Sequence, residues 1–202
     1  MDSYPFVLSL LPIFKTTNMI NGVVMLLNKR FSIFLLSLML LGCNSGEEIE
    51  TVVDPQTFES GEECHVCGMV ISRFPGPKGQ AFEPRTEQMR KFCSTMELMI
   101  WYLQPENQTN VSVVYVHDMA FSPWDKPSDS YLIDAKNAIY VLGSDMPASM
   151  GQSLATFSSE SAAKSFIVQH GGEIISFENL SLNRLMNRLM NRFMNRFMNK
   201  IN

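Results

Sequence analysis

The feature that most constrains the fold of this chain is an order of strand and helix signals that occurs twice. In the first half, residues 80–92 have the pattern of a strand or hairpin, and Val111–Val116 is a β-branched and aromatic run typical of a strand. Between them, Ser94 and Glu97 have the spacing of a capping box, which predicts a helix over residues 93–104. Shorter elements are expected around these: a strand at 70–74, a turn at 75–79 and a turn at 107–110.

The second half repeats the same order of signals. We expect strands within residues 131–142 and at 154–157, a helix at 160–170 capped by Ser158 or Ser159 and ended by Gly171-Gly172, and a strand at 173–177. Phe92-Cys93-Ser94 and Phe157-Ser158-Ser159 stand at matching places before the two helices, so Cys93 is matched by Ser158. We therefore predict an α+β fold of two similar ββαβ units, at about 61–120 and 130–178, packed as one small domain over 61–180.

The start of the chain predicts export and lipidation. Lys29 and Arg30 precede an apolar run, Phe31–Leu41, which has the length of a signal-peptide core and is too short to cross a bilayer. The run ends in Leu-Leu-Gly-Cys43, which resembles a lipobox, so we expect a lipoprotein signal peptide at 25–42 and a lipid on Cys43. Residues 1–24 fit no secretion signal, and we interpret them as translated upstream sequence before a true start at Met25.

Charge is spread unevenly over the exported chain. Residues 43–60 are polar and acidic, which predicts a flexible tether between lipid and domain. Residues 43–180 contain 8 Lys/Arg and 19 Asp/Glu, and such an acidic body argues against nucleic-acid binding. Asn44, after the lipidated cysteine, favours sorting to an outer membrane, with the protein facing the periplasm.

The tail, residues 181–202, contains 5 basic residues and no acid, and repeats Asn-Arg-Leu-Met twice and then Asn-Arg-Phe-Met twice. A period of four lies close to the helical 3.6, so the methionines form one stripe beside the Leu and Phe positions. Three interpretations stay open: a functionless repeat expansion, a basic amphipathic helix on a membrane surface, and a methionine ladder for Cu(I).

The candidate chemistry lies in Cys64-His65-Val66-Cys67-Gly68-Met69. With Cys43 carrying lipid, Cys64, Cys67 and Cys93 are left, and an odd number of thiols in an exported chain indicates a metal or reactive site. A thioredoxin-like redox role needs a helix directly after the CxxC, and the strand-like residues that follow argue against it.

Metal binding leaves two alternatives. A structural zinc site needs four ligands, which Cys64, Cys67 and Cys93 with His65 or His117 can supply, although a second closely spaced Cys/His pair is missing. Cu(I) needs fewer ligands and prefers thiolate, thioether and imidazole. Strand alternation would place Cys67 and Met69 on one face, as it would His117 and Met119 at the end of the 111–116 strand, and a sheet can bring the two pairs together.

Several motifs together resemble the NosL family over about residues 60–180. They are Cys64-x-x-Cys-Gly-Met69, Pro75-Gly-Pro-Lys78, Lys91-Phe-Cys-Ser-Thr95, Leu103-Gln-Pro-Glu-Asn107, Tyr115-Val-His-Asp-Met-Ala120, Trp124, Met150-Gly-x-x-Leu-Ala-x-Phe157 and His170-Gly-Gly172. The repeat tail has no counterpart in that family's pattern.

The resemblance implies a membrane-anchored, non-enzymatic Cu(I) chaperone. Its partners would be nitrous oxide reductase, whose copper–sulfide centre it helps to load, and an ABC-type maturation complex. The implied Cu(I) ligands are Cys64, Cys67, Met69 and His117, with Cys93, Met119 and Met150 as weaker candidates, and His65 as a bystander. A lipoprotein thiol–disulfide oxidoreductase and a structural zinc-binding domain remain the alternatives.

Overall fold

The computed structural model describes residues 53–149 and 151–201. The predictions for residues 1–24, for the signal peptide at 25–42, for the lipid on Cys43 and for Met150 therefore concern positions outside the described residues. The described part of the tether, 53–60, has no regular secondary structure.

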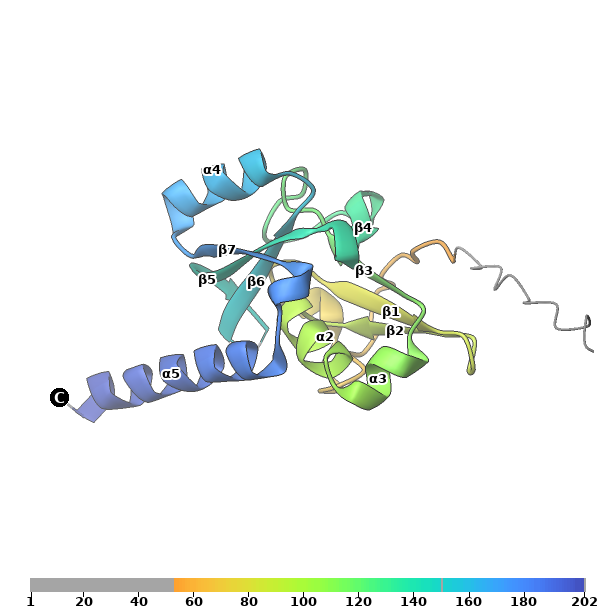
Figure 1. The fold of residues 1–202 in the computed structure, drawn as a ribbon, viewed down its shortest axis with the longest axis horizontal. Coiled ribbons are helices and arrows are strands. Elements are labelled where there is room, and N and C mark those ends of the chain that lie inside the picture. The colour runs from red at the N-terminus through yellow and green to blue at the C-terminus, as the bar shows by residue number, and fades with distance from the viewer. Residues whose placement is uncertain (1–52, 150, 202) are drawn as a thin grey trace, which may run out of the picture. The chain divides into compact units, whose positions relative to one another are not determined.

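The first unit is built on an antiparallel sheet. The hairpin β1 (Gly79–Glu83) and β2 (Gln88–Phe92) is followed by helices α2 (Thr95–Tyr102) and α3 (Pro105–Asn110) and by strand β3 (Val113–His117). The sheet order is β2-β1-β3-β4, where the short edge strand β4 (Leu132–Asp134) lies outside the repeated unit (Figure 1). The predicted hairpin, helix and strand are confirmed.

The second unit repeats this topology. Strands β5 (Ile139–Ala148) and β6 (Gly151–Phe157) precede helix α4 (Glu160–His170) and strand β7 (Glu173–Ser176), and the sheet order is β6-β5-β7. In both units the first strand is central and pairs with the second and the last strand, all antiparallel. The predicted α+β fold of two ββαβ units is therefore confirmed, and Ser159 and Gly171 cap α4 as expected.

Helix α2 lies between the two sheets and contacts β1, β2 and β6. Residues Thr95–Met99 are all buried, so the helix has no solvent-facing polar side over that stretch, as expected for a helix enclosed by its neighbours. Gly79 permits this close packing, because a Cβ there would lie 2.2 Å from Leu98 Cδ2 and 3.0 Å from the Tyr115 carbonyl oxygen. The start of α2 is thus held in the interior of the domain.

Two hydrophobic cores lie on opposite faces of the second sheet. Along β5, Tyr140 and Leu142 belong to the core shared with α2, whereas Val141 belongs to a smaller core with Phe157 and the α4 residue Ala163. This alternation follows from the two-residue period of a strand. The second sheet is therefore covered by α2 on one face and by α4 on the other.

Two predicted elements are wrong. Residues 70–74 do not form a strand: Val70 makes a single β-bridge to Glu63, and a 3-10 turn, η1 (Ile71–Arg73), follows. The segment bonds within its own turn, because Arg73 and Phe74 donate their N–H groups to the carbonyls of Val70 and Ile71 at 3.3 Å each. The buried Lys78 ammonium donates to the carbonyls of Phe74, Pro75 and Gly76 at 2.6, 3.0 and 3.0 Å, which fixes the chain that follows.

The predicted turn at 107–110 is the last part of helix α3. Pro105 occupies its first turn, where a missing N–H costs nothing, and the Asn107 side chain donates to the Trp101 carbonyl at 2.8 Å. Three further 3-10 turns complete the domain: η2 (Asp129–Tyr131), η3 (Ala135–Asn137) and η4 (Phe177–Asn179).

The tail forms a helix, α5 (Leu182–Ile201), which extends away from the rest of the domain (Figure 1). It contacts α2 near its beginning, where Leu185 is fully buried in the larger core and Leu189 packs against that core. Among the described residues, no helix is both long enough and apolar enough to cross a membrane.

Candidate metal centre

The cysteine loop is a closed turn rather than a strand. Cys64 donates its N–H to the Met69 carbonyl at 2.8 Å, and Gly68 donates to the Cys64 carbonyl at 2.9 Å. Gly68 has φ 68, a left-handed conformation that glycine adopts without strain and that turns the chain back. The predicted strand alternation of Cys67 and Met69 is therefore wrong.

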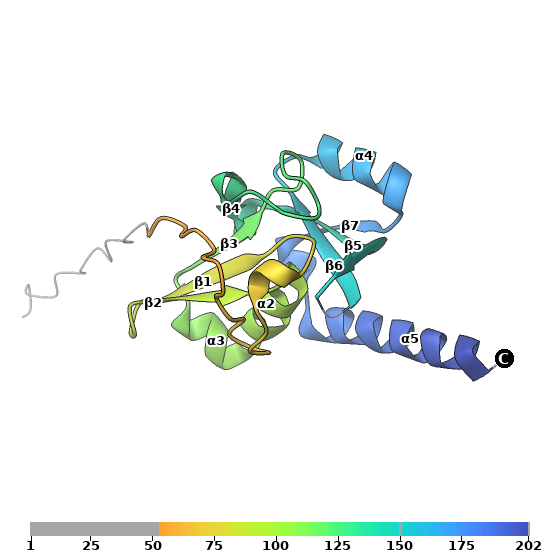
Figure 2. The ribbon, with the colours of Figure 1, turned by 180° about the vertical axis from the view of Figure 1, so that it is seen from behind.

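The loop is fastened to the edge of the first sheet. His65 donates its N–H to the Lys91 carbonyl of β2 at 2.8 Å, and the Lys91 ammonium binds Glu62 at 2.7 Å just before the loop. Seen from behind, the segment that leads through the loop to β1 runs on the near side of the domain (Figure 2). The end of β2 leads directly into Cys93, so these contacts bring the loop to the start of α2.

Helix α2 contributes a thiol and a carboxylate. Cys93 directly precedes the N-cap residue Ser94, whose hydroxyl accepts the Glu97 N–H at 3.2 Å. The predicted N-cap is confirmed, but the Glu97 carboxylate does not complete a reciprocal capping box. It instead accepts hydrogen bonds from the Cys93 thiol and, at 3.2 Å, from the Ser149 hydroxyl.

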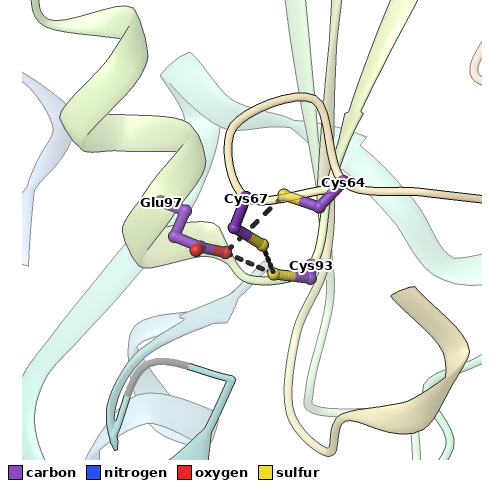
Figure 3. A group of neighbouring side chains, drawn as sticks. All are labelled: Cys64, Cys67, Cys93 and Glu97. Atoms are coloured by element: carbon purple, nitrogen blue, oxygen red, sulfur yellow. Dashed lines mark hydrogen bonds between the residues drawn. The ribbon is translucent and has the colours of Figure 1, made fainter. Parts of the chain in front are cut away.

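These segments bring four ligating groups together. The sulfur atoms of Cys64, Cys67 and Cys93 and a carboxylate oxygen of Glu97 all lie within 4.8 Å of one another (Figure 3). The Cys67 and Cys93 sulfurs are 3.5 Å apart, and all three cysteines are free. Three thiols and one carboxylate form a donor set that suits a soft or borderline metal ion.

The cluster is closed on the protein side and open at one cysteine. Cys64, Cys93 and Glu97 are buried, with relative exposures of 3%, 0% and 8%, whereas Cys67 is half-buried. A metal ion held here would therefore be reached from solvent past Cys67.

The ionisable groups of the cluster differ in pKa. The hydrogen bond from the Cys93 thiol, together with nearby backbone N–H groups, lowers the pKa of Cys64 well below its usual range. The same pairing, burial and the Glu97 carboxylate raise the pKa of Cys93, and burial raises the pKa of Cys67. Burial also raises the pKa of Glu97. The three cysteines of the metal-free cluster thus differ in acidity, and Cys64 has the lowest pKa of the three.

The structure does not place His117 in this cluster. Its Nδ1 accepts the Lys78 N–H at 3.0 Å, so the proton lies on Nε2, which donates to the Asp129 carboxylate at 3.0 Å. The ring is almost fully buried and neither nitrogen is open to a metal ion. The predicted imidazole ligand instead joins β3 to the segment before β1 and to η2.

The other predicted residues lie in three kinds of surroundings. Met119 is buried in the smaller core beside α4, which is a packing position. Met69 is half-buried at the end of the cysteine loop, next to the cluster in sequence. His65 packs edge-on against Phe92 and Trp101, with ring centroids 5.7 and 5.4 Å away, in agreement with a bystander role.

Glu97 is the functional candidate that the sequence analysis missed. Its spacing from Ser94 matched a capping box, and that local role accounted for the carboxylate. The available signal was the spacing of Cys93 and Glu97 within the predicted helix at 93–104, since residues four apart lie on one side of a helix. In the structure Cys93 precedes the N-cap, and Glu97 in the first turn reaches back to it. Likewise, Cys93 is an equal member of the cluster rather than a weaker candidate.

Comparison with known proteins shows that the cluster lies in a region shared with a known family. The sequence description of the NosL family matches residues 55–185, which include all four residues of the cluster. The chain belongs to the NosL family. The matched region also includes both ββαβ units but ends soon after α5 begins.

Individual NosL proteins are similar over most of their length. The copper-binding lipoprotein NosL of Stutzerimonas stutzeri is 49% identical over 146 residues, which cover 72% of this chain and 76% of that protein. The copper-binding lipoprotein NosL of Achromobacter cycloclastes is 30% identical over 155 residues, covering 75% and 80%. The crystal structure of the copper chaperone NosL from Shewanella denitrificans superposes with a TM-score of 0.62 at 43% identity, covering 63% of this chain and 96% of that one.

Proposed function

We propose that this chain is a non-enzymatic, lipid-anchored Cu(I) carrier that delivers copper for the copper–sulfide centre of nitrous oxide reductase. The observation that carries the proposal is the meeting of three free thiols at a site that opens through half-buried Cys67. The names of the relatives, copper-binding lipoprotein and copper chaperone, support it.

The ligand set fits a carrier better than a permanent metal site. Cu(I) prefers sulfur, so the three cysteines are the proposed ligands, with Met69 as an additional thioether at the loop's end. Glu97 is the harder donor, and its position beside Cys93 suits it to hold the proton that the thiol releases. Because Cys67 lies at the opening, a ligand from an acceptor protein can replace it first and draw the ion out.

Delivery is the part of the proposal that involves partners. We infer that the acceptor is nitrous oxide reductase or the ABC-type complex that matures it, on the basis of the family resemblance in the sequence. Lipidation at Cys43 would hold the carrier at the membrane on the periplasmic side, with Asn44 favouring the outer membrane.

An anaerobic competition assay against a chromogenic Cu(I) chelator tests copper binding. Replacing Cys67→Ser removes a thiolate and is expected to weaken Cu(I) affinity at least a hundredfold, while Met69→Ala weakens it about tenfold. His65→Ala is a matched control in the same loop and should leave affinity unchanged. Unchanged affinity in both Cys67→Ser and Met69→Ala would overturn the proposal.

Two measurements separate the alternatives. Insulin reduction with a dithiol would reveal an oxidoreductase. The element that follows the CxxC is the 3-10 turn η1 and not an activating α-helix, so the expected rate is that of the buffer alone. Metal analysis after anaerobic purification with equal copper and zinc distinguishes the carrier from a zinc domain. The Glu97 carboxylate supplies the fourth donor that a zinc site needs, so zinc retained in preference to copper would support that alternative.

A further inference from the structure

Helix α5 has an apolar side that continues far beyond the domain on which it begins. Ten apolar residues recur at spacings of three and four, which places them along one winding stripe of the helix. We call these residues the α5 stripe: Leu182, Leu185, Met186, Leu189, Met190, Phe193, Met194, Phe197, Met198 and Ile201.

The protein covers only the beginning of the α5 stripe. Leu185 is fully buried and Leu189 packs against the larger core, but Phe193 and Ile201 are 68% and 64% exposed. The repeat also places four exposed methionines in the stripe, Met186, Met190, Met194 and Met198. An apolar surface of this length in water indicates a partner that covers it.

The opposite side of α5 carries positive charge at every fourth position. Residues 181–202 contain five basic residues and no acid, in contrast to the acidic body of the chain. At the beginning of the helix, Arg184 binds Glu173 at 3.2 Å, while Arg188 and Arg192 line a cavity beside β5. Like charges four residues apart repel each other along a helix, and an anionic partner relieves that repulsion.

The α5 stripe and the charge of the helix together indicate which kind of partner covers it. A bilayer-spanning role is excluded for this helix by the basic residue in every turn. A second copy of α5 would set two helices side by side that each carry five basic residues and no acid of their own, which opposes a helix–helix dimer. A basic amphipathic helix with Phe and Leu on its apolar side matches the surface of an anionic bilayer, which offers acyl chains to the apolar side and negative phosphates to the basic residues.

We propose that α5 lies on the surface of an anionic phospholipid bilayer. The exposed part of the α5 stripe enters the boundary between headgroups and acyl chains, and the basic part of the helix beyond the domain supplies positive charge for lipid phosphate. Because α5 packs on α2, this contact holds the domain that carries the cysteine cluster close to the membrane. That last consequence rests on the proposed copper function; the lipid contact itself does not.

Vesicle binding by the unlipidated chain tests the proposal. The processed chain, residues 43–202 with Cys43→Ser, carries neither the signal peptide nor the lipid, so any binding comes from the surface of the protein itself. It is expected to sediment with vesicles that contain phosphatidylglycerol at least tenfold more strongly than with pure phosphatidylcholine vesicles, and to be released as salt rises. Equal sedimentation with both vesicles, or with neither, would overturn the proposal.

Matched variants identify the surface responsible. The pair Phe193→Ser and Phe197→Ser should lose vesicle binding at least tenfold, whereas Asn187→Ser with Asn199→Ser, on the polar side, should retain it. The triple change Met190→Leu, Met194→Leu and Met198→Leu keeps the stripe apolar but removes the thioethers, so vesicle binding should persist. If that triple variant lost vesicle binding and bound fewer Cu(I) ions, α5 would be a metal ladder and the proposal would fail.

Two readouts keep the result independent of folding and of the copper proposal. Circular dichroism and the Cu(I) affinity of the cysteine cluster should be unchanged in the Phe193→Ser and Phe197→Ser variant, because both side chains lie beyond the core. Sedimentation equilibrium without vesicles is expected to show a monomer. A dimer that these serines dissociate would show that a second copy covers the stripe, and would overturn the membrane assignment.

Discussion

At the scale of single residues, the main finding is that a buried carboxylate shares a small space with three thiols. Glu97 lies beside Cys93 and within reach of Cys64, whose sulfur is 3.8 Å from its oxygen. Sequence alone pointed first to Cys64 and Cys67, because their spacing is local, and gave Cys93 as a weaker candidate. That Cys93 and Glu97 meet the loop depends on how β2 and α2 fold back on it, which no local pattern contains.

Replacing Glu97→Gln tests the electrostatic role of this carboxylate. Its negative charge and its hydrogen bond help to raise the pKa of Cys93. An uncharged amide of the same shape should lower the midpoint of the thiolate titration by about one pH unit. Ultraviolet absorbance of the thiolate measures this; a midpoint that stayed in place or rose would contradict the role.

The affinity for Cu(I) should rise with pH. Burial raises the pKa of Cys67, and the surroundings raise that of Cys93, so both sulfurs hold protons that the metal must displace. Because binding releases protons, a lower proton concentration favours the bound state, by up to tenfold per pH unit for each proton displaced. Competition assays between pH 6 and 9 check this, and affinity that falls with pH would contradict it.

Replacing His117 should lower the stability of the domain and leave its affinity for Cu(I) unchanged. Its two ring nitrogens bond the Lys78 N–H and the Asp129 carboxylate in a buried position. Replacement by Ala leaves the Lys78 N–H without its partner and Asp129 with only the Phe58 N–H, and should lower the free energy of unfolding by about 2 kcal/mol, measured by urea denaturation. Cu(I) affinity should be unchanged; a tenfold loss in the folded variant would restore His117 as a ligand.

At the scale of elements, the enclosed helix α2 decides the geometry of the centre. Gly79→Ala should destabilise the domain by about 1–3 kcal/mol, because the added methyl meets buried Leu98 and the Tyr115 carbonyl. Combining it with Leu98→Ala opens space for the methyl, so the two changes should cost less together than the sum of each alone. A strictly additive pair in urea denaturation would contradict this packing.

Most of these elements could be predicted from the sequence. The hairpin, the two capped helices and the duplicated order follow from strand patterns and caps, which are local. The strand predicted at 70–74 is wrong because the backbone there bonds within its own 3-10 turn. The turn predicted at 107–110 is wrong because the helix signal lies upstream, in Pro105. Met119 lies in the smaller core and not beside the cysteines, because a strand pattern does not say which core a face meets.

At the scale of the whole molecule, the chain combines an acidic domain with a basic helix that the NosL match barely enters. The domain explains the proposed copper function through a site assembled from two separate segments. The helix supplies a second, membrane-directed surface that shares a core with α2. Both proposals place the cysteine cluster at a bilayer, one through the lipid on Cys43 and one through α5.

The most direct test of the central claim is the Cu(I) affinity of the Cys93→Ser variant. Only the folded arrangement brings Cys93, 26 residues beyond Cys67 in sequence, to within 3.5 Å of it. If the three cysteines form one centre, anaerobic competition should show affinity at least tenfold weaker than for the unchanged chain, with folding intact by circular dichroism. An affinity equal to that of the unchanged chain would show that the CxxC loop binds copper alone and would contradict the account.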